Sequence, residues 1–288
     1  MNNYKTFNSN ELALKEKHQL LLASVAPRPI GFTASKNSDG HVNLAPFSYH
    51  NAFSSNPPIV GISPAFSGKT GKSKNTLTNI LDTKEFTLSI VTHDMVEQMN
   101  ICAADYESNI DEFNKSGLTK YDGNHISVPG VAESPLILEC KFIQHIKFSD
   151  KPAGGNLLLG EIVCFHARED IYDEMGNLDP IKIDQVSRLG KNWYSRANQG
   201  LFDLPAPRFI PIGVDSLPLE VKNSAFFSGK LLARLAYVES IPIFDESFYL
   251  KEKFINMGQE DLLKNCAIFL ENGKVEDAWQ LLHLGKII

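Results

Sequence analysis

The feature that most constrains this 288-residue chain is a long alternating pattern at residues 136–148. Leucine, cysteine and phenylalanine fill one set of alternate positions, and isoleucine shares the other set with charged residues. Such alternation predicts a β-strand, and apolar groups on both faces are typical of a barrel strand that a partner covers. Gly154-Gly155 then provides a turn into residues 157–167, which we expect to pair back antiparallel.

Several shorter strand patterns, separated by turn residues, precede this pair. They lie at residues 30–34, 42–45, 58–63 and 86–91, and short helical patterns interrupt them. This order predicts a mainly β fold, an antiparallel barrel of Greek-key type with inserted helices. The chain has neither a strand–helix–strand alternation nor a G-x-G-x-x-G motif, which argues against a Rossmann dinucleotide domain.

Residues 27–51 suggest a backbone segment that faces a ligand. Asp39-Gly40 separates two apolar runs and is typical of a hairpin turn. Pro46 cannot donate a ladder hydrogen bond, so we expect a bulge or a loop crossing there. An ordinary kinked hairpin explains the same pattern without any ligand.

Charge and cysteine usage narrow the functional class. The formal net charge of −6 argues against general binding to nucleic acid or an anionic membrane, and no apolar run reaches the length of a membrane span. The N-terminus lacks the basic-then-apolar pattern of a signal peptide, which favours a cytoplasmic location. The four cysteines are scattered and the histidines do not cluster, so we expect reduced thiols and no metal site.

A lysine-rich stretch at residues 65–76 indicates an anion site. It resembles the end of a Walker A loop, but the required first glycine is absent, so we reject a P-loop nucleotidase. Thr76 is expected to cap a helix beside Lys69, Lys72 and Lys74, and a helix N-terminus beside lysines favours negative charge. A solvated lysine loop is the alternative interpretation.

Helical patterns elsewhere are less specific. Ser9 or Asn10 is expected to cap a helix that ends before Pro27, and Asp94 and Asp111 are expected to cap two more. Beyond residue 214 the patterns become helical, at residues 221–238, 247–257, 259–270 and 275–284. The sequence therefore predicts two parts, a barrel domain at residues 1–214 and a helical extension at residues 215–288.

The order of many short motifs over residues 19–210 resembles the flavin reductase-like family of FMN-binding split barrels. The motifs are PRPIGF at residues 27–32, DG-x-x-NLAPFS at 39–48, NPP at 56–58, KNT with NI at 74–80, DEF at 111–113, LGEI at 159–162, and RLG with Tyr194 at 188–194. Asn75 replaces the usual aspartate of the family, and Asn156 stands where many relatives have a histidine.

The resemblance implies an FMN site on these motifs. Lys74, Thr76 and the helix start would hold the phosphate. Asn43, Ala45, Pro46, Phe47 and Ser48 would line the ring edge, with N–H or hydroxyl donors from Ala45, Phe47 and Ser48. Asn75, Asn79 and Asn156 are further cofactor-binding positions, and Arg188 and Tyr194 would lie close to the flavin or to a dimer contact. The family also pairs as homodimers. No catalytic side chain is expected, because the flavin carries the hydride chemistry.

Three functions follow from this interpretation. The first is an FMN-dependent oxidoreductase of the flavin reductase type, with NADH or NADPH as co-substrate. The second is a non-catalytic protein that stores FMN or senses redox state. The third is a split-barrel relative that uses pyridoxal phosphate or another phosphate-bearing cofactor at the same clamp. The sequence does not identify the electron donor or acceptor.

Overall fold

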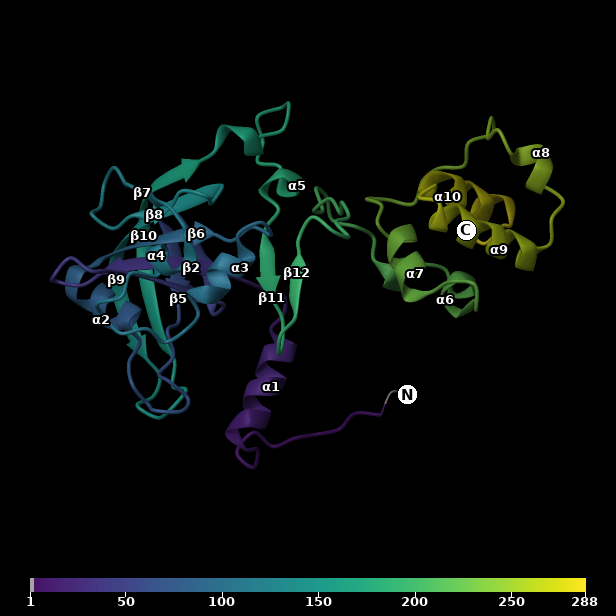
Figure 1. Cartoon of the computed structure of the whole chain (residues 1–288). Coiled ribbons are helices and arrows are strands. Elements are labelled where there is room, and N and C mark those ends of the chain that lie inside the picture. Colours follow the sequence, from purple (N-terminus) through teal and green to yellow (C-terminus); the bar gives the residue numbers. More distant parts are fainter. Residues whose placement is uncertain (1–2) are drawn as a thin grey trace. The chain divides into compact units, whose positions relative to one another are not determined.

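A computed structural model describes residues 3–288. The chain divides into two compact units, Met1–Leu201 and Phe202–Ile288. The first unit is built around a seven-stranded antiparallel sheet with the strand order β3-β2-β6-β9-β10-β5-β4 (Figure 1). The strands are β2 (Gly31–Lys36), β3 (Val42–Phe47), β4 (His50–Ser55), β5 (Pro58–Ile62), β6 (Glu85–Ile90), β9 (Leu136–Lys147) and β10 (Asn156–Ala167). The pairing does not close, so β3 and β4 remain edge strands.

The long strand pair lies at the centre of this sheet. β9 and β10 pair antiparallel from Leu136↔Ala167 to Lys147↔Asn156, which confirms the pairing expected from the alternation. Register shifts interrupt the pairing between Leu159 and Gly160 and between Ile162 and Cys164. Each of these two central strands has 12 residues.

The hairpin of β2 and β3 forms as predicted, and the expectation for Pro46 is wrong. β3 runs through Pro46, which lies opposite Phe32 without any register shift. The proline is tolerated because β3 is an edge strand, where a missing N–H breaks no ladder bond. Gly40 at the turn has a φ of 88°, a left-handed conformation that suits glycine.

Helices cover two hydrophobic clusters of the first unit. α2 (Asn75–Thr83) buries Leu77 and Ile80 against Phe86 and Leu158 of the sheet. α3 (Val96–Ile101) and α4 (Glu112–Ser116) pack beside β3, where Met99 and Phe113 join the second cluster. These contacts hold the start of α2 and the end of α3 close to β3.

The remaining elements of the first unit lie outside the seven-stranded sheet. They are α1 (Leu14–Ser24), β1 (Arg28–Pro29), β7 (Lys120–Tyr121), β8 (Gly130–Val131), η1 (Glu169–Ile171), α5 (Pro180–Ile183), β11 (Val186–Arg188) and β12 (Tyr194–Arg196). β1, β11 and β12 form a separate three-stranded sheet, and β7 pairs with β8. None of the described residues 3–288 belongs to a helix with both the length and the apolarity to cross a bilayer.

The second unit is helical, with η2 (Val214–Ser216), α6 (Leu219–Asn223), α7 (Gly229–Leu235), α8 (Lys251–Phe254), α9 (Gln259–Glu271) and α10 (Val275–Leu284). Its own core surrounds Trp279, whose indole N–H donates to the carbonyl of Leu235 over 3.1 Å. By contacts this unit starts at Phe202, and Ile212 packs against its core. The domain boundary between residues 214 and 215 remains a prediction.

Several predicted helix boundaries are wrong. α1 begins after Ala13 rather than after Ser9 or Asn10, and α3 begins after Met95 rather than at Asp94. The cap of α2 is Lys74, and Thr76 lies inside the helix. The helix expected at residues 221–238 divides into α6 and α7, and that expected at 247–257 shrinks to α8. The cap at Asp111 is confirmed, since its side chain accepts the N–H of Phe113.

Candidate functional site

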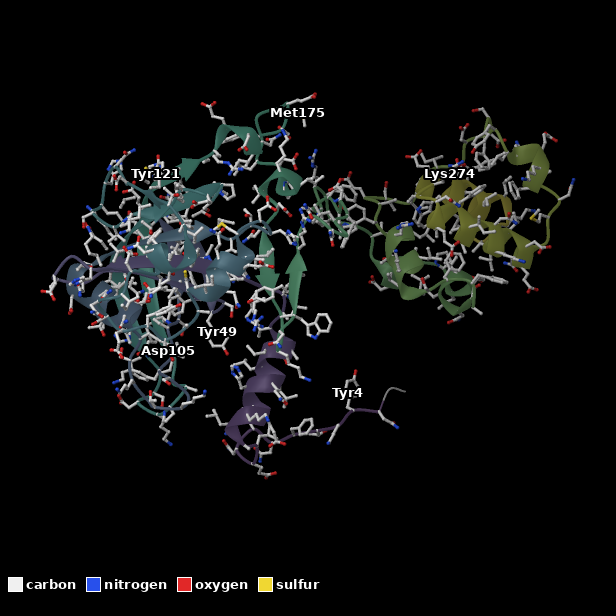
Figure 2. All side chains as sticks on the ribbon, viewed as in Figure 1. Tyr4, Tyr49, Asp105, Tyr121, Met175 and Lys274 are labelled. Carbon is white, nitrogen blue, oxygen red and sulfur yellow. The ribbon has the colours of Figure 1, made fainter. Side chains whose placement is uncertain are left out.

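A cleft of about 330 Å³ lies between the edge strand β3, the start of α2 and the segment after α3. Figure 2 shows Asp105 of that segment low on the first unit. The cleft brings together most of the predicted site residues, which come from segments about 30 residues apart in the sequence. These residues are Asn43, Ala45, Pro46, Phe47, Lys74, Asn75 and Thr76.

The start of α2 is fixed by hydrogen bonds to both neighbouring segments. The amide of Asn43 donates to the hydroxyl of Thr76 over 2.9 Å, and both side chains are buried. The amide of Asn75 donates to the carbonyl of Tyr106 over 3.2 Å. The first turn of a helix has N–H groups without intrahelical acceptors, so α2 presents donors at the cleft.

Lysines and hydroxyl groups surround this helix start. Lys72 and Lys74 line the cleft with Ser67, Thr70 and Ser73. The ammonium of Lys74 pairs with the carboxylate of Asp105, and both side chains are partly or largely exposed. An exposed ion pair of this kind stabilises a fold by only about 0–1 kcal/mol, so a phosphate can replace the carboxylate at little cost.

The edge of β3 forms the opposite wall. The N–H of Leu44 points away from β2 and donates to Glu112 over 2.9 Å. Because N–H directions alternate along an antiparallel strand, the N–H groups of Ala45 and Phe47 face β2. The wall therefore offers carbonyl oxygens and the apolar surfaces of Ala45, Pro46 and Phe47, rather than free backbone donors from those two residues.

Glu112 is a buried carboxyl group at the base of the cleft. Its side chain is only 3% exposed, and burial raises the pKa of this carboxyl, although the N–H of Leu44 acts in the opposite direction. Sequence analysis did not assign Glu112 a role, and it also missed Asp105, Tyr106 and Glu107 of the same cleft. The DEF motif at residues 111–113 was the one signal that pointed to this region.

The structure places the other predicted residues outside this cleft. Asn79 is buried one helical turn further along α2, where its amide donates to Ser35 over 3.2 Å. Ser48 lines a separate hollow with Tyr49 and His50. Asn156 is buried and bonds His145 over 3.0 Å and the carbonyl of Pro64 over 3.2 Å.

Arg188 and Tyr194 also lie apart from the cleft. They line a larger hollow of about 990 Å³ between α3 and the hairpin of β11 and β12. The guanidinium of Arg188 lies 4.4 Å from the ring centroid of Tyr194. The resemblance implies that Arg188 and Tyr194 lie near the flavin or a dimer contact. The structure places both in a hollow that does not include the start of α2.

One trio among the described residues offers metal-ligand atoms close together, namely Glu139, Cys164 and His166. Glu139 already accepts the N–H groups of Asn124, His125 and Ile126, as well as a bond from His166 over 2.6 Å. A carboxylate offers about four lone-pair positions, and these bonds occupy them. We therefore assign no metal to this trio.

The cleft has the groups that a flat, phosphate-bearing cofactor needs. A phosphate needs cationic and N–H donors, which Lys72, Lys74 and the start of α2 provide. A flat three-ring system needs an apolar wall, which β3 provides. The chemistry of the residues therefore suits a flat molecule that carries a phosphate at one end.

Comparison with known proteins agrees with this geometry. The family model described as flavin reductase like domain matches residues 23–182. The uncharacterized protein YwrF of Bacillus subtilis is 34% identical over 197 residues, which cover 67% of this chain and 95% of YwrF. The chain belongs to the flavin reductase-like family, a class of flavin-related oxidoreductases with the split-barrel fold.

Two solved structures share the fold of the first unit. Nitrilotriacetate monooxygenase component B from Bacillus cereus has a TM-score of 0.66 and 32% identity, over 71% of this chain and 100% of that chain. The 2-nitrobenzoate 2-nitroreductase NbaA of Pseudomonas fluorescens has a TM-score of 0.64 and 30% identity, over 72% of this chain and 98% of that chain. These relatives are covered almost completely, while the second unit of this chain lies outside the family match.

Proposed function

We propose that this protein binds FMN in the cleft at the start of α2 and acts as an oxidoreductase of the flavin reductase type. It would pass hydride or electrons between a nicotinamide or other donor and the flavin. The observation that carries the proposal is the convergence of Lys74, Asn75 and Thr76 with the edge of β3 around one cleft. The similarity to a monooxygenase component and to a nitroreductase supports redox chemistry.

The residues of the cleft would bind and orient the cofactor. Lys74 and the N–H groups of α2 would hold the phosphate, with Lys74 leaving Asp105 to do so. Pro46 and Phe47 would support one edge of the ring, and Asn43 would keep Thr76 in place. When bound, FMN supplies the hydride-accepting and hydride-donating chemistry, so the protein needs to position the redox partner and exclude water.

A spectrum of the purified protein tests this function. We expect a yellow protein whose visible absorbance bleaches when NADH or NADPH is added without oxygen. A yellow protein that no nicotinamide reduces would instead indicate FMN storage or redox sensing. An absorbance typical of pyridoxal phosphate would contradict the assignment of FMN.

We also propose that the protein is a homodimer. Ile143 of β9 and Phe165 of β10 are 49% and 58% exposed, although both strands are central in the sheet. α1 buries none of its residues, and Leu20 and Leu21 are exposed on it. A second copy would cover these apolar groups, and light scattering at micromolar concentration should give twice the chain mass. A monomeric mass would contradict the dimer.

The cytoplasm is the location that we propose. All four cysteines are free, and Cys102, Cys140 and Cys266 are buried. Free thiols of this kind suit a reducing compartment. A fluorescent fusion found outside the cytoplasm of its own cell would contradict this location.

A further inference from the structure

The hollow that contains Ser48 and Tyr49 has a volume of about 310 Å³. Its lining comes from the turn between α1 and β1, from β4 and the residues leading into it, and from parts of β5 and β10. Figure 2 shows Tyr49 at the lower side of the first unit, toward α1. The hollow shares no lining residue with the cleft at the start of α2, so it is a separate candidate site.

The buried polar side chain of this lining is that of Arg28, which is only 4% exposed. Its Nη1 donates to the carbonyls of Leu22 and Val25 at the end of α1, and its Nη2 donates to the carbonyl of Leu189 over 2.9 Å. A guanidinium has five N–H donors, and the Nε–H of Arg28 has no acceptor among the described residues. The protein thus anchors Arg28 without using all of its donors.

The positive charge of Arg28 has no opposite charge beside it. None of the ion pairs among residues 3–288 includes Arg28, and the described lining of the hollow has neither aspartate nor glutamate. The residue opposite Arg28 in the sheet is Arg188, and like charges directly opposite each other destabilise a sheet. Burial, and to a lesser extent the charge of Arg188, lowers the pKa of Arg28. A buried charge is costly unless it is paired, so an anion in this hollow would stabilise Arg28.

Two more groups of the lining define what this anion can be. Tyr49 is half-buried, and burial raises its pKa although the charge of Arg28 acts in the opposite direction. Its hydroxyl is therefore protonated at pH 7 and can donate to an oxygen anion. The ring of His50 bonds the carbonyl of Gly61 over 3.1 Å, and burial lowers the pKa of His50, so this ring is neutral at pH 7.

Apolar side chains line the hollow around Gly61. A Cβ on this glycine would lie 2.6 Å from the ring of Phe53 and 3.1 Å from Leu157, so both side chains pack directly over it. Pro27 and Pro29 add further apolar surface to the lining. A volume of about 310 Å³ is at the small end of ligand pockets. The hollow therefore suits a small molecule with an anionic group and a short hydrocarbon part.

We propose that this hollow binds a small monocarboxylate with a hydrocarbon chain. The carboxylate would meet the guanidinium of Arg28 and the hydroxyl of Tyr49, and the chain would pack on Phe53 and Leu157. The site stands on the hollow alone, whether or not FMN binds in the cleft, and it takes no part in the proposed electron transfer.

Isothermal titration calorimetry of the full chain with hexanoate and hexanamide tests the site. The two molecules share a hydrocarbon chain, and only hexanoate carries a charge. Hexanoate should bind saturably with one molecule per chain, and hexanamide should bind about tenfold more weakly or worse, because hydrogen bonds between charged groups are the stronger ones. Propionate should bind more weakly than hexanoate by about fourfold for each methylene that it lacks.

Variants of the two polar residues assign the carboxylate contacts. Arg28→Gln removes the charge and should abolish the preference for hexanoate over hexanamide. Tyr49→Phe removes only a hydroxyl and should weaken hexanoate by about tenfold. Tyr172→Phe is the matched control, since it removes a hydroxyl outside the hollow and should leave the affinity unchanged. Thermal melting checks that each variant folds, and Tyr49→Phe supports the test if Arg28→Gln unfolds.

Three results would overturn the proposal. The first is no saturable binding of hexanoate, and the second is equal affinity for hexanoate and hexanamide, either of which would leave Arg28 as a structural anchor for α1. The third is an equal effect of Tyr49→Phe and Tyr172→Phe on hexanoate binding. Lys74→Ala should leave hexanoate binding intact, so a failure of the FMN proposal is seen separately.

Discussion

At the scale of single residues, Glu139 is a carboxylic acid of the first unit whose pKa is strongly shifted. Its side chain is fully buried, and burial alone would raise the pKa of the carboxyl. The N–H groups of Asn124, His125 and Ile126 and the ring of His166 outweigh that effect and lower the pKa of Glu139 from 4.5 to about 2. Figure 2 shows Tyr121, whose hydroxyl lies 3.3 Å from His166, at the opposite end of the first unit from Asp105.

We predict that Glu139→Gln lowers the free energy of unfolding at pH 7 by roughly 1.5–3 kcal/mol, because charged hydrogen bonds are lost. The folded pKa lies below the unfolded one, so the carboxylate stabilises the fold above about pH 4.5. This stabilisation is lost as pH falls from about 4.5 to 2. Calorimetry of the first unit across this range should show a steeper acid loss in the wild type than in the variant.

The control for this prediction is Glu169→Gln, which changes an exposed carboxylate near the end of β10. It should follow the wild-type curve at every pH. Parallel acid curves for wild type and Glu139→Gln would show that the buried carboxylate does not titrate as described.

At the scale of elements, β10 depends on a glycine over which the side chain of Phe86 from β6 packs. A Cβ on Gly160 would lie 2.4 Å from the ring of Phe86, which is itself fully buried. The ring cannot retreat into a packed core, so Gly160→Ala should destabilise the first unit by roughly 1–3 kcal/mol. Urea unfolding followed by circular dichroism measures this loss. Gly68→Ala is the control, since its Cβ would meet only Ala153 at 3.9 Å, and an equal loss in both variants would contradict the packing argument.

The sequence predicted the elements whose pattern is long and regular. α10 has the predicted bounds, and β9 differs by one residue, because their periodicity extends over ten residues or more. The helix expected at residues 221–238 breaks instead, since Ser228 accepts the N–H of Leu231 and starts a new helix. The helix expected from Ser247 begins late, because Asp245 binds the N–H and hydroxyl of Ser247 in a turn. Hydrogen bonds of this kind leave the spacing of the apolar residues unchanged, so the spacing alone did not reveal these two helix boundaries.

The site was predictable where its residues are close to a motif, and less so where tertiary packing decides. Lys74, Asn75 and Thr76 form one helix start, so their proximity follows from the chain itself. Their meeting with Asn43 follows from the hairpin and the resemblance together. The segment with Asp105 carries no chemical motif, and only the packing of α3 and α4 brings it to the cleft.

At the scale of the whole molecule, the two units have separate cores. The family match ends at residue 182, and the relatives are covered almost completely without the second unit. We therefore predict that a chain ending at Leu201 binds FMN within about twofold of the full chain, because the residues of the cleft and the core beneath them all belong to the first unit. Fluorescence titration of FMN measures this. A large loss of affinity in the shortened chain would show that the second unit contributes to the site.

The phosphate clamp at Lys74 is the centre of this account, and a comparison of FMN with riboflavin tests it most directly. Riboflavin has the same rings without the phosphate, so Lys74→Ala should weaken FMN by roughly tenfold or more and leave riboflavin nearly unchanged. Lys69→Ala, a change in the same loop outside the cleft, should alter neither affinity. Equal losses for the two flavins, or an unchanged affinity for FMN, would contradict the placement of the phosphate at the start of α2.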